Sequence, residues 1–424
     1  MNHEDGRPST RSGMLKSGSP KPSKQFRRYD NMTVGNGAGA EKRRLSQLYF
    51  LYYAAVGIYM PYLALYLQQS GMNGVAIGST MGLLPVIGVI SPLFWGWLSD
   101  RWGKTVAVMA ILLGGAAFSL ILFMSMRQLL LTVAVLVLIT LFINAYPSLL
   151  DGMTLSYLQT ASGQYGRLRV WGSVGYGVGG MIATAVLWRL PMGSLFLTAA
   201  LILLLGIAVT LRLKTASPSS ADRTGRAQGP RGLGSAPFVL FLLMAFLLQV
   251  ANSFYGSFFG IYIHDVGGTQ SAIGIANVIS SVCELPFFYY ASTVVARFGA
   301  LRTLSAAGLL YALRWGLLGA FPGMATAYST QLLHGCTFCL YFAAAMDYIA
   351  RSIPERSRTT GIAVFTAVIA LAGILGNVMN GFLYDYQGLL SMPYASSLFA
   401  VLAGSGFIGL ERHEARLRAR GSLS

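Results

Sequence analysis

The chain has 424 residues, of which 54% are hydrophobic and 11% are charged, a composition typical of a membrane protein. Its formal net charge is +17, but the basic residues lie between long apolar blocks, so the charge indicates membrane topology and no nucleic-acid partner. The sequence contains no phosphate-binding loop or soluble catalytic domain, and the C-x-x-C of Cys336 and Cys339 near His334 lacks the further ligands of a metal site. We therefore expect neither an enzyme nor an ATP-driven pump, and no cofactor or metal.

The first 44 residues are polar, basic and rich in Gly and Ser. They lack the apolar core of a secretory signal, so residues 1–44 are predicted to be a disordered cytoplasmic tail. Residues 45–99 then contain no charged side chain. That length suffices for two helices of about 20 residues across a ~30 Å hydrocarbon core.

Long uncharged or nearly uncharged blocks continue to the end of the chain. Those without charge are 105–126, 128–150, 170–188, 190–211, 232–263, 359–384 and 386–410, while 266–296 and 303–346 hold isolated ionisable residues. With 45–99 divided in two and 303–346 divided at Phe321-Pro322-Gly323, the pattern predicts twelve transmembrane helices. A barrel is excluded because these blocks are about twice as long as barrel strands.

The positions of the basic residues predict how the protein crosses the membrane. If the N-terminus is inside, 28 of the 31 Lys and Arg residues fall on the cytoplasmic side, as the positive-inside rule requires. We expect a monomeric, multi-pass protein of the plasma (inner) membrane, surrounded by lipids, with both termini cytoplasmic. A polar linker (214–236) separates two six-helix halves, 45–213 and 237–411, and residues 412–424 form a short tail.

The two halves resemble each other when the sequence is shifted by 196 positions. Tyr59 then aligns with Tyr255, Arg101 with Arg297, and Asp151 with Asp347. Paired repeats in transporters place a solute site between the halves near the membrane midplane.

Two motifs carry a family resemblance. "GWLSDRWGK" follows the Gly-x-x-x-Asp-Arg-x-Gly pattern of the major facilitator superfamily, and "YGRLRVWGSVGYGVGG" is similar to helix 5 of its lactose permease, phenylpropionate permease and nucleoside–proton symporter branch. The resemblance implies an all-α fold of two six-helix pseudo-repeats and proton-coupled uptake of a small organic solute. We predict that the first motif is part of a gate, with Gly96, Asp100, Arg101, Gly103, Lys104 and, in the second half, Arg297.

Glu284 is the only charged residue between Val266 and Ala296. A buried carboxylate at that depth costs about 2.5–3.5 kcal/mol or more when ionised and unpaired, so it is expected to be protonated or to face a cation. Arg314 and His334, on the next two predicted helices, are the available partners. These three residues form either a proton-coupling set or a static salt bridge between Glu284 and Arg314 with His334 as a bystander. If the three residues form a proton-coupling set, protons are transported together with the solute.

Aromatic and amide residues predict a cavity wall. Tyr59 and Tyr62 share one face of the first helix, as Asn252 and Tyr255 do on the repeat-related seventh, and the wall would stack on a ring-shaped solute. Helix packing with internal hydrogen bonds is the alternative. Gln331 and Phe338, on the tenth helix, complete this expected set.

Asp151 and Arg169 lie near the predicted inner ends of helices 4 and 5. The resemblance to the sugar permease implies that this pair and Tyr176 bind solute hydroxyls. In the alternative, Asp151 pairs with Arg101 or Lys104 and Asp347 pairs with Arg297 or Arg302, which would latch the inner side closed.

Three functions remain open from the sequence. The first is a proton-coupled symporter of a sugar, nucleoside or aromatic acid. The others are a proton-driven exporter of hydrophobic compounds and a membrane sensor that transports nothing.

Overall fold

The computed structural model describes residues 24–126, 128–160, 165–213 and 234–419. Residues 1–41 and residues 42–424 form separate units, and all contacts discussed below lie within the second. The regular elements of the described residues are helices throughout. The linker expected at 214–236 lies largely outside this description.

The described part of the first half contains eight α-helices and one short 3-10 segment. They are α1 (Lys24–Tyr59), η1 (Met60–Tyr62), α2 (Leu63–Gln69), α3 (Gly74–Trp102), α4 (Thr105–Met124), α5 (Leu129–Ile143), α6 (Tyr146–Thr160), α7 (Tyr165–Leu187) and α8 (Ser194–Thr210).

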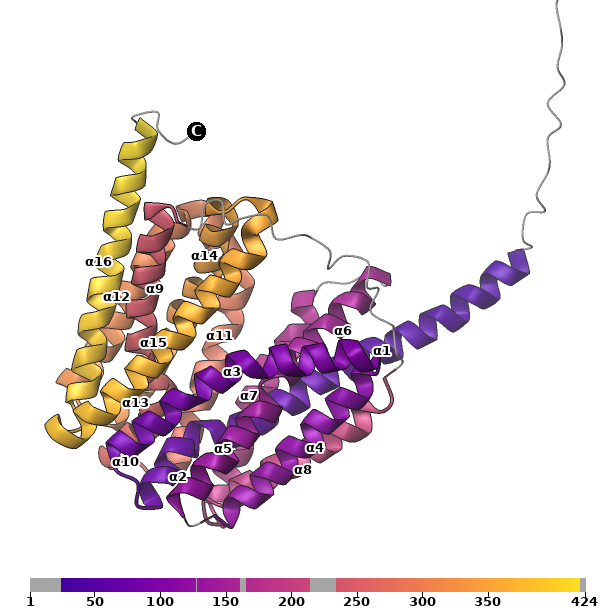
Figure 1. Ribbon diagram of the computed structural model, residues 1–424, viewed down its shortest axis with the longest axis horizontal. Coiled ribbons are helices and arrows are strands. Elements are labelled where there is room, and N and C mark those ends of the chain that lie inside the picture. Colours follow the sequence, from indigo (N-terminus) through magenta and orange to yellow (C-terminus); the bar gives the residue numbers. More distant parts are fainter. Residues whose placement is uncertain (1–23, 127, 161–164, 214–233, 420–424) are drawn as a thin grey trace, which may run out of the picture. The chain divides into compact units, whose positions relative to one another are not determined.

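The second half contains the remaining elements. They are α9 (Ala236–Ser253), η3 (Phe254–Phe258), α10 (Phe259–Asp265), α11 (Gln270–Phe298), α12 (Ala300–Ala320), α13 (Met324–Ser329), η4 (Thr330–Leu333), α14 (His334–Ser352), η5 (Glu355–Ser357), α15 (Arg358–Gln387) and α16 (Ser391–Ala419). Within this half α16 packs along α9 and α12, and α12 packs along α14 (Figure 1).

The helices confirm an all-α membrane protein. Among the described residues, nine helices are long and apolar enough to cross a membrane, and α11 makes a tenth if its two arms, bent by 55°, count as one span. The helix α8 is apolar but short, and α12, which carries Arg302 and Arg314, is also outside this set. Counting broken helices as single spans, the observed elements are consistent with the predicted twelve.

Two helix ends differ from the predicted tails. Helix α1 begins at Lys24, so residues 24–44 are helical where a disordered tail is expected, and α16 continues to Ala419. Extending a helix that already exists costs much less than nucleating a new one, which explains both extensions. Residues 1–23 lie outside the described part of the chain.

The internal repeat is visible in the element bounds. A shift of 196 residues converts the bounds of α3 into those of α11. It also brings the bounds of α4 within one residue of those of α12. The two halves therefore contain the same helix order.

Glycines allow the two halves to approach closely along two seams, α3 with α15 and α7 with α11. A Cβ added to Gly381 would collide with the backbone of Gly74, and one added to Gly274 would lie 2.7 Å from the carbonyl oxygen of Gly180. Such small residues permit close packing of membrane helices, where dispersion contacts drive association.

Hydrogen bonds join the halves at the end of the bundle that carries the turns before Gly74 and Gln270, which we call the distal end. The Asp385 carboxylate of α15 accepts hydrogen bonds from the backbone N–H groups of Gly74 (2.7 Å) and Val75 (2.8 Å) of α3. Tyr384 receives a hydrogen bond from Gln68 (2.6 Å) and donates one to Asp265 (2.7 Å).

Candidate functional site

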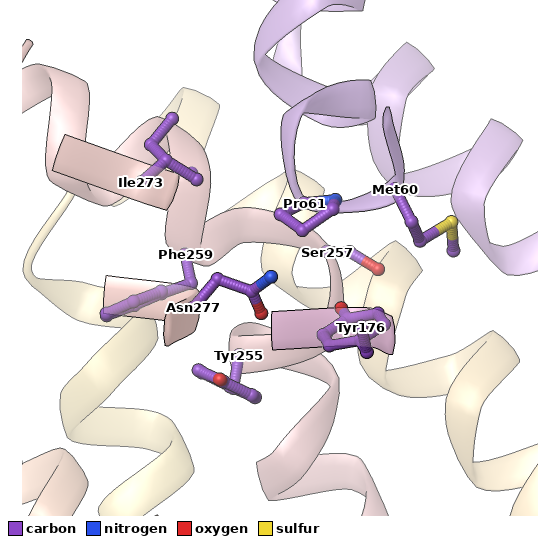
Figure 2. Close-up of a pocket in the computed structure, with 10 residues that line it drawn as sticks. Met60, Pro61, Tyr176, Tyr255, Ser257, Phe259, Ile273 and Asn277 are labelled. Atoms are coloured by element: carbon purple, nitrogen blue, oxygen red, sulfur yellow. The ribbon is translucent and has the colours of Figure 1, made fainter. Parts of the chain in front are cut away.

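A cavity of about 70 Å³ lies between the two halves. Both halves contribute to its wall, which is formed by Met60, Pro61, Tyr176, Tyr255, Gly256, Ser257, Phe259, Gly260, Ile273 and Asn277 (Figure 2).

Helix breaks bring the cavity wall together. The 3-10 segment η1 contains Pro61 and interrupts the first span, whereas the π-helical segment η3 interrupts the seventh. A shift of 196 residues places Met60 on Gly256, so both breaks occupy the same place in the repeat. A Cβ added to Gly260 would lie 2.7 Å from the carbonyl oxygen of Pro61, which shows how closely the two breaks approach. π-Helical segments are frequent at functional sites.

Only some of the aromatic residues that the sequence predicts for the cavity wall line the cavity. Tyr176 and Tyr255 line the cavity, but Tyr59 and Tyr62 are buried away from it. The Tyr59 ring lies 6.2 Å from that of Phe196 in the first half, and the Tyr62 hydroxyl lies at the seam between the halves, 2.6 Å from a Cβ added to Gly274. The 3-10 turn after Tyr59 places Met60 and Pro61 on the cavity side in their place. The sequence does contain a signal for this position, namely a proline within an uncharged helix.

The remaining expected cavity residues lie close to the site but do not line this cavity. Asn252 has a buried Oδ1 without a hydrogen-bond partner among the described residues. The Phe338 ring lies 5.8 Å from that of His334. Gln331 is fully buried and bonds to Arg314.

A buried polar network connects three helices beside the cavity. The Nε2 of His334 lies 2.9 Å from a carboxylate oxygen of Glu284. Its Nδ1 lies 2.8 Å from Arg314 Nη1, and Arg314 Nη2 donates to the Gln331 side chain at 2.6 Å. The structure therefore brings the three predicted residues together, and the described residues show no direct contact between Glu284 and Arg314 of the kind that the static salt bridge would require. His334 lies between them because its ring has a nitrogen on each side.

The contacts of His334 assign its tautomer. A guanidinium only donates hydrogen bonds, so Nδ1 of His334 must accept and carries no hydrogen. The single proton of the neutral ring is then on Nε2, which donates to Glu284. In this arrangement Glu284 is the member of the trio with a free site for a further proton.

The network reaches the cavity through Tyr255. The Arg314 guanidinium carbon lies 4.6 Å from the centre of the Tyr255 ring and 4.5 Å from that of Trp315. The His334 ring lies 4.9 Å from that of Tyr255. A solute that moves Tyr255 would therefore disturb both Arg314 and His334.

Glu284 also lies next to a kink. The helix α11 contains Pro286, which removes one backbone hydrogen bond of the helix, and its two arms, Gln270–Phe287 and Tyr289–Phe298, are bent by 55°.

Asp151 and Arg169 lie near one another in the first half and are connected through tyrosines. Tyr49 donates a hydrogen bond to Asp151, and its ring centre lies 5.7 Å from the Arg169 guanidinium carbon. Arg169 also donates to the Tyr53 hydroxyl at 2.6 Å. Neither Asp151 nor Arg169 lines the cavity, since Arg169 is seven residues, or about 10 Å of helix, from Tyr176.

The predicted gate residues make other contacts in this structure. Asp347 pairs with Arg351 at 2.8 Å, and Arg302 pairs with Glu411 at 2.6 Å. Arg101 and Arg297 each lie over an aromatic ring of their own helix, 5.5 Å from its centre. The Asp347 side chain therefore has a partner on its own helix where the latch reading expects one from Arg297 or Arg302.

The glycines of the "GWLSDRWGK" motif differ in their surroundings. Gly103 ends α3 with φ +62°, a left-handed conformation that favours glycine. A Cβ added to Gly96 would have open space around it. Asp100 and Lys104 are exposed at the same end of α3.

Comparisons with known proteins agree with this architecture. The model of the MFS_1 like family matches residues 42–393. The chain is 33% identical to the maltose permease of Geobacillus stearothermophilus over 337 residues, covering 78% of this chain and 84% of the permease. It is 26% identical to the probable 3-phenylpropionic acid transporter of Escherichia coli (strain K12), covering 82% of this chain and 92% of the relative.

Among solved structures, a mutant form of the nucleoside transporter NupG superposes with a TM-score of 0.75 at 17% identity, covering 87% of this chain and 99% of that chain. This likeness supports the fold. Taken with the family model and the permease relatives, the two-half helical architecture shows that the chain belongs to the MFS_1 like family of the major facilitator superfamily and is a multi-pass membrane transporter, not an enzyme.

Proposed function

We propose that the protein is a proton-coupled symporter that takes up a small organic solute, such as a sugar, nucleoside or aromatic acid, by alternating access. The observation that carries the proposal is the buried Glu284–His334–Arg314 network beside the cavity. The names of the relatives, which include a maltose permease and a probable 3-phenylpropionic acid transporter, support these solute classes.

The network supplies a coupling mechanism. With Glu284 ionised, its charge balances the fully buried Arg314 through the neutral His334. Protonation of Glu284 removes that balance and leaves a buried cation uncompensated, which is costly in a low-dielectric interior. The loaded carrier lowers this cost when Tyr255 and the polar groups of the solute rearrange beside Arg314, so that proton and solute are carried together.

The orientation is part of the same proposal. We place the distal end outside and both termini in the cytoplasm of a plasma membrane, as the distribution of Lys and Arg favours. The hydrogen bonds of Asp385 and Tyr384 then hold the outer side closed, and the solute leaves the cavity toward the cytoplasm.

The test is substitution of Glu284 by Gln in purified protein reconstituted into liposomes. Gln has nearly the same volume and mimics a permanently protonated carboxyl, so solute binding and the exchange of labelled for unlabelled solute are expected to continue. Uphill accumulation driven by an imposed pH gradient should fall to background, because the empty carrier must release its proton before it returns. Glu355→Gln, at an exposed position of η5, is the matched control and should accumulate solute normally.

Two other outcomes contradict the proposal in different ways. Full uphill transport by Glu284→Gln would show that Glu284 does not carry the coupled proton. Parallel loss of expression, binding and exchange would show a static structural network, since breaking a buried charge pair costs roughly 3–5 kcal/mol.

A further inference from the structure

Asn277 of α11 is a buried polar side chain whose hydrogen-bonding capacity is not used within the described residues. It is 6% exposed, it lines the cavity, and its Nδ2 has no hydrogen-bond partner there. Figure 2 shows its amide among the rings of Tyr176, Tyr255 and Phe259. An unpaired buried amide is costly, so a group that enters the cavity and accepts its hydrogen bond is favoured.

The neighbouring hydroxyl of Ser280 on the same face of α11 already has partners. Ser280 donates to the backbone carbonyl of Asn277 at 2.8 Å and receives a hydrogen bond from the Tyr255 hydroxyl at 3.4 Å. Asn277 Nδ2 is therefore a donor on this face that is available to a solute.

The charge of the wall limits the solute. None of the ten residues that line the cavity carries a formal charge. The nearby cation, Arg314, bonds to His334 and Gln331 through its two Nη atoms and lies against the Tyr255 and Trp315 rings, outside the wall, and its Nε has no partner among the described residues. A solute carboxylate in this cavity would lose its water without meeting a charged group in the wall, which is strongly unfavourable.

We propose that Asn277 is a solute-binding residue that donates its amide N–H to an oxygen of a neutral, polar ring compound held between Tyr176 and Tyr255. The inference depends on the proposed function in one respect, since it takes the bound compound to be the transported solute. Among the solute classes proposed above, it favours sugars and nucleosides over aromatic acids. The present volume of about 70 Å³ is half of the roughly 150 Å³ that holds benzene in an apolar cavity. The cavity thus receives the hydroxylated edge of the solute in this state, and the halves separate to admit the whole ring.

The test compares Asn277→Ala and the isosteric Asn277→Asp with a matched control, Asn377→Ala. Asn377 of α15 is 5% exposed, has an unpartnered amide oxygen within the described residues, and does not line the cavity. Binding and exchange of three labelled probes, a neutral disaccharide, a neutral nucleoside and an aromatic acid anion, are measured in liposomes for all four proteins. Thermal unfolding in detergent shows that each variant is folded.

The wild type is expected to bind at least one neutral probe and to exclude the anion. Asn277→Ala should weaken that binding about tenfold, the loss expected for one buried neutral hydrogen bond, and Asn377→Ala should leave it unchanged. Deoxygenated forms of the bound probe identify the oxygen, because the form that lacks it should bind the wild type more weakly and the Ala variant equally. This difference between the wild type and the Ala variant distinguishes a direct contact of Asn277 with the solute from a general loss of protein stability.

Several results would overturn the inference. They are binding of the anion but no neutral probe, binding of none of the three, and unchanged affinity in both Asn277 variants. Recording proton movement in the same liposomes tests proton-coupled symport separately from solute binding by Asn277. If exchange of a neutral probe depends on Asn277 but moves no protons, symport is refuted, whereas the role of Asn277 in solute binding is supported.

Discussion

At the scale of single residues, the position of His334 decides how the buried charges interact. Its ring separates Glu284 from Arg314 and bonds to both. The sequence alone indicates that the Glu284 carboxylate is buried within an uncharged stretch, and that it needs a cation nearby when it is ionised. Which residue stands between the two depends on where α12 and α14 pack against α11, and no pattern within one helix contains that information.

The tautomer of His334 leads to a test. Glutamine can accept a hydrogen bond from Arg314 through its amide oxygen and donate one to Glu284 through its amide nitrogen, as the neutral imidazole does. We expect His334→Gln to retain uphill accumulation at a reduced rate and His334→Ala to lower it more than tenfold, because the Ala variant removes the His334 hydrogen bonds of two buried charged groups, Glu284 and Arg314. Accumulation measured with an imposed pH gradient checks this. Loss of accumulation with intact exchange in His334→Gln would instead show that His334 itself must be protonated.

At the scale of elements, the N-terminus of α3 is capped from two directions. Asn73, the residue before the helix, accepts a hydrogen bond from the Ala76 N–H at 2.9 Å, and Asp385 of α15 accepts those of Gly74 and Val75. A carboxylate stabilises the positive end of a helix dipole. The Asn73 cap is local to one half, whereas the Asp385 cap joins the halves and must break when the distal end opens.

Asp385→Asn should therefore shift the protein toward the state that is open at the distal end. Loss of the charge at the α3 N-terminus is expected to cost about 0.5–2 kcal/mol, enough to raise the population of that state severalfold. The measurement is the rate at which a thiol reagent added from the distal side labels Ile273→Cys in the cavity wall. Asn73→Ala weakens the same helix end within one half, so it is the matched control and should leave the labelling rate unchanged. Equal rates in all three backgrounds would refute the role of Asp385 as an outer latch.

At the scale of the whole molecule, two repeats and a shared set of helix bounds follow from one internal duplication. The halves have nonetheless diverged in their chemistry. The second half contains Glu284, Arg314 and His334, while the first contains Asp151 and Arg169 connected through Tyr49 and Tyr53. We infer that proton coupling belongs to the second half, and the solute contacts predicted for Asp151 and Arg169 remain a prediction for the first.

The proposed orientation is tested by labelling. In a cysteine-free background, Ser219→Cys in the linker should react with a membrane-impermeant reagent only after the membrane is permeabilised. Gln387→Cys, at the exposed distal end of α15, should react in intact cells. The reverse pattern would invert the topology and with it the assignment of outer and inner ends.

The sequence by itself determined the class of fold, the repeat and the identity of the buried ionisable residues. These depend on composition and on distances along the chain, because lipid forces every apolar span to satisfy its own backbone as a helix. It did not determine that Tyr59 packs inside the first half and Tyr62 at the seam with Gly274, that Met60 and Pro61 face the cavity, or that His334 bridges Glu284 and Arg314. Tertiary structure decided these points, because a 3-10 or π-helical turn rotates every later side chain, and only the packing of several helices selects the neighbour that a buried group meets.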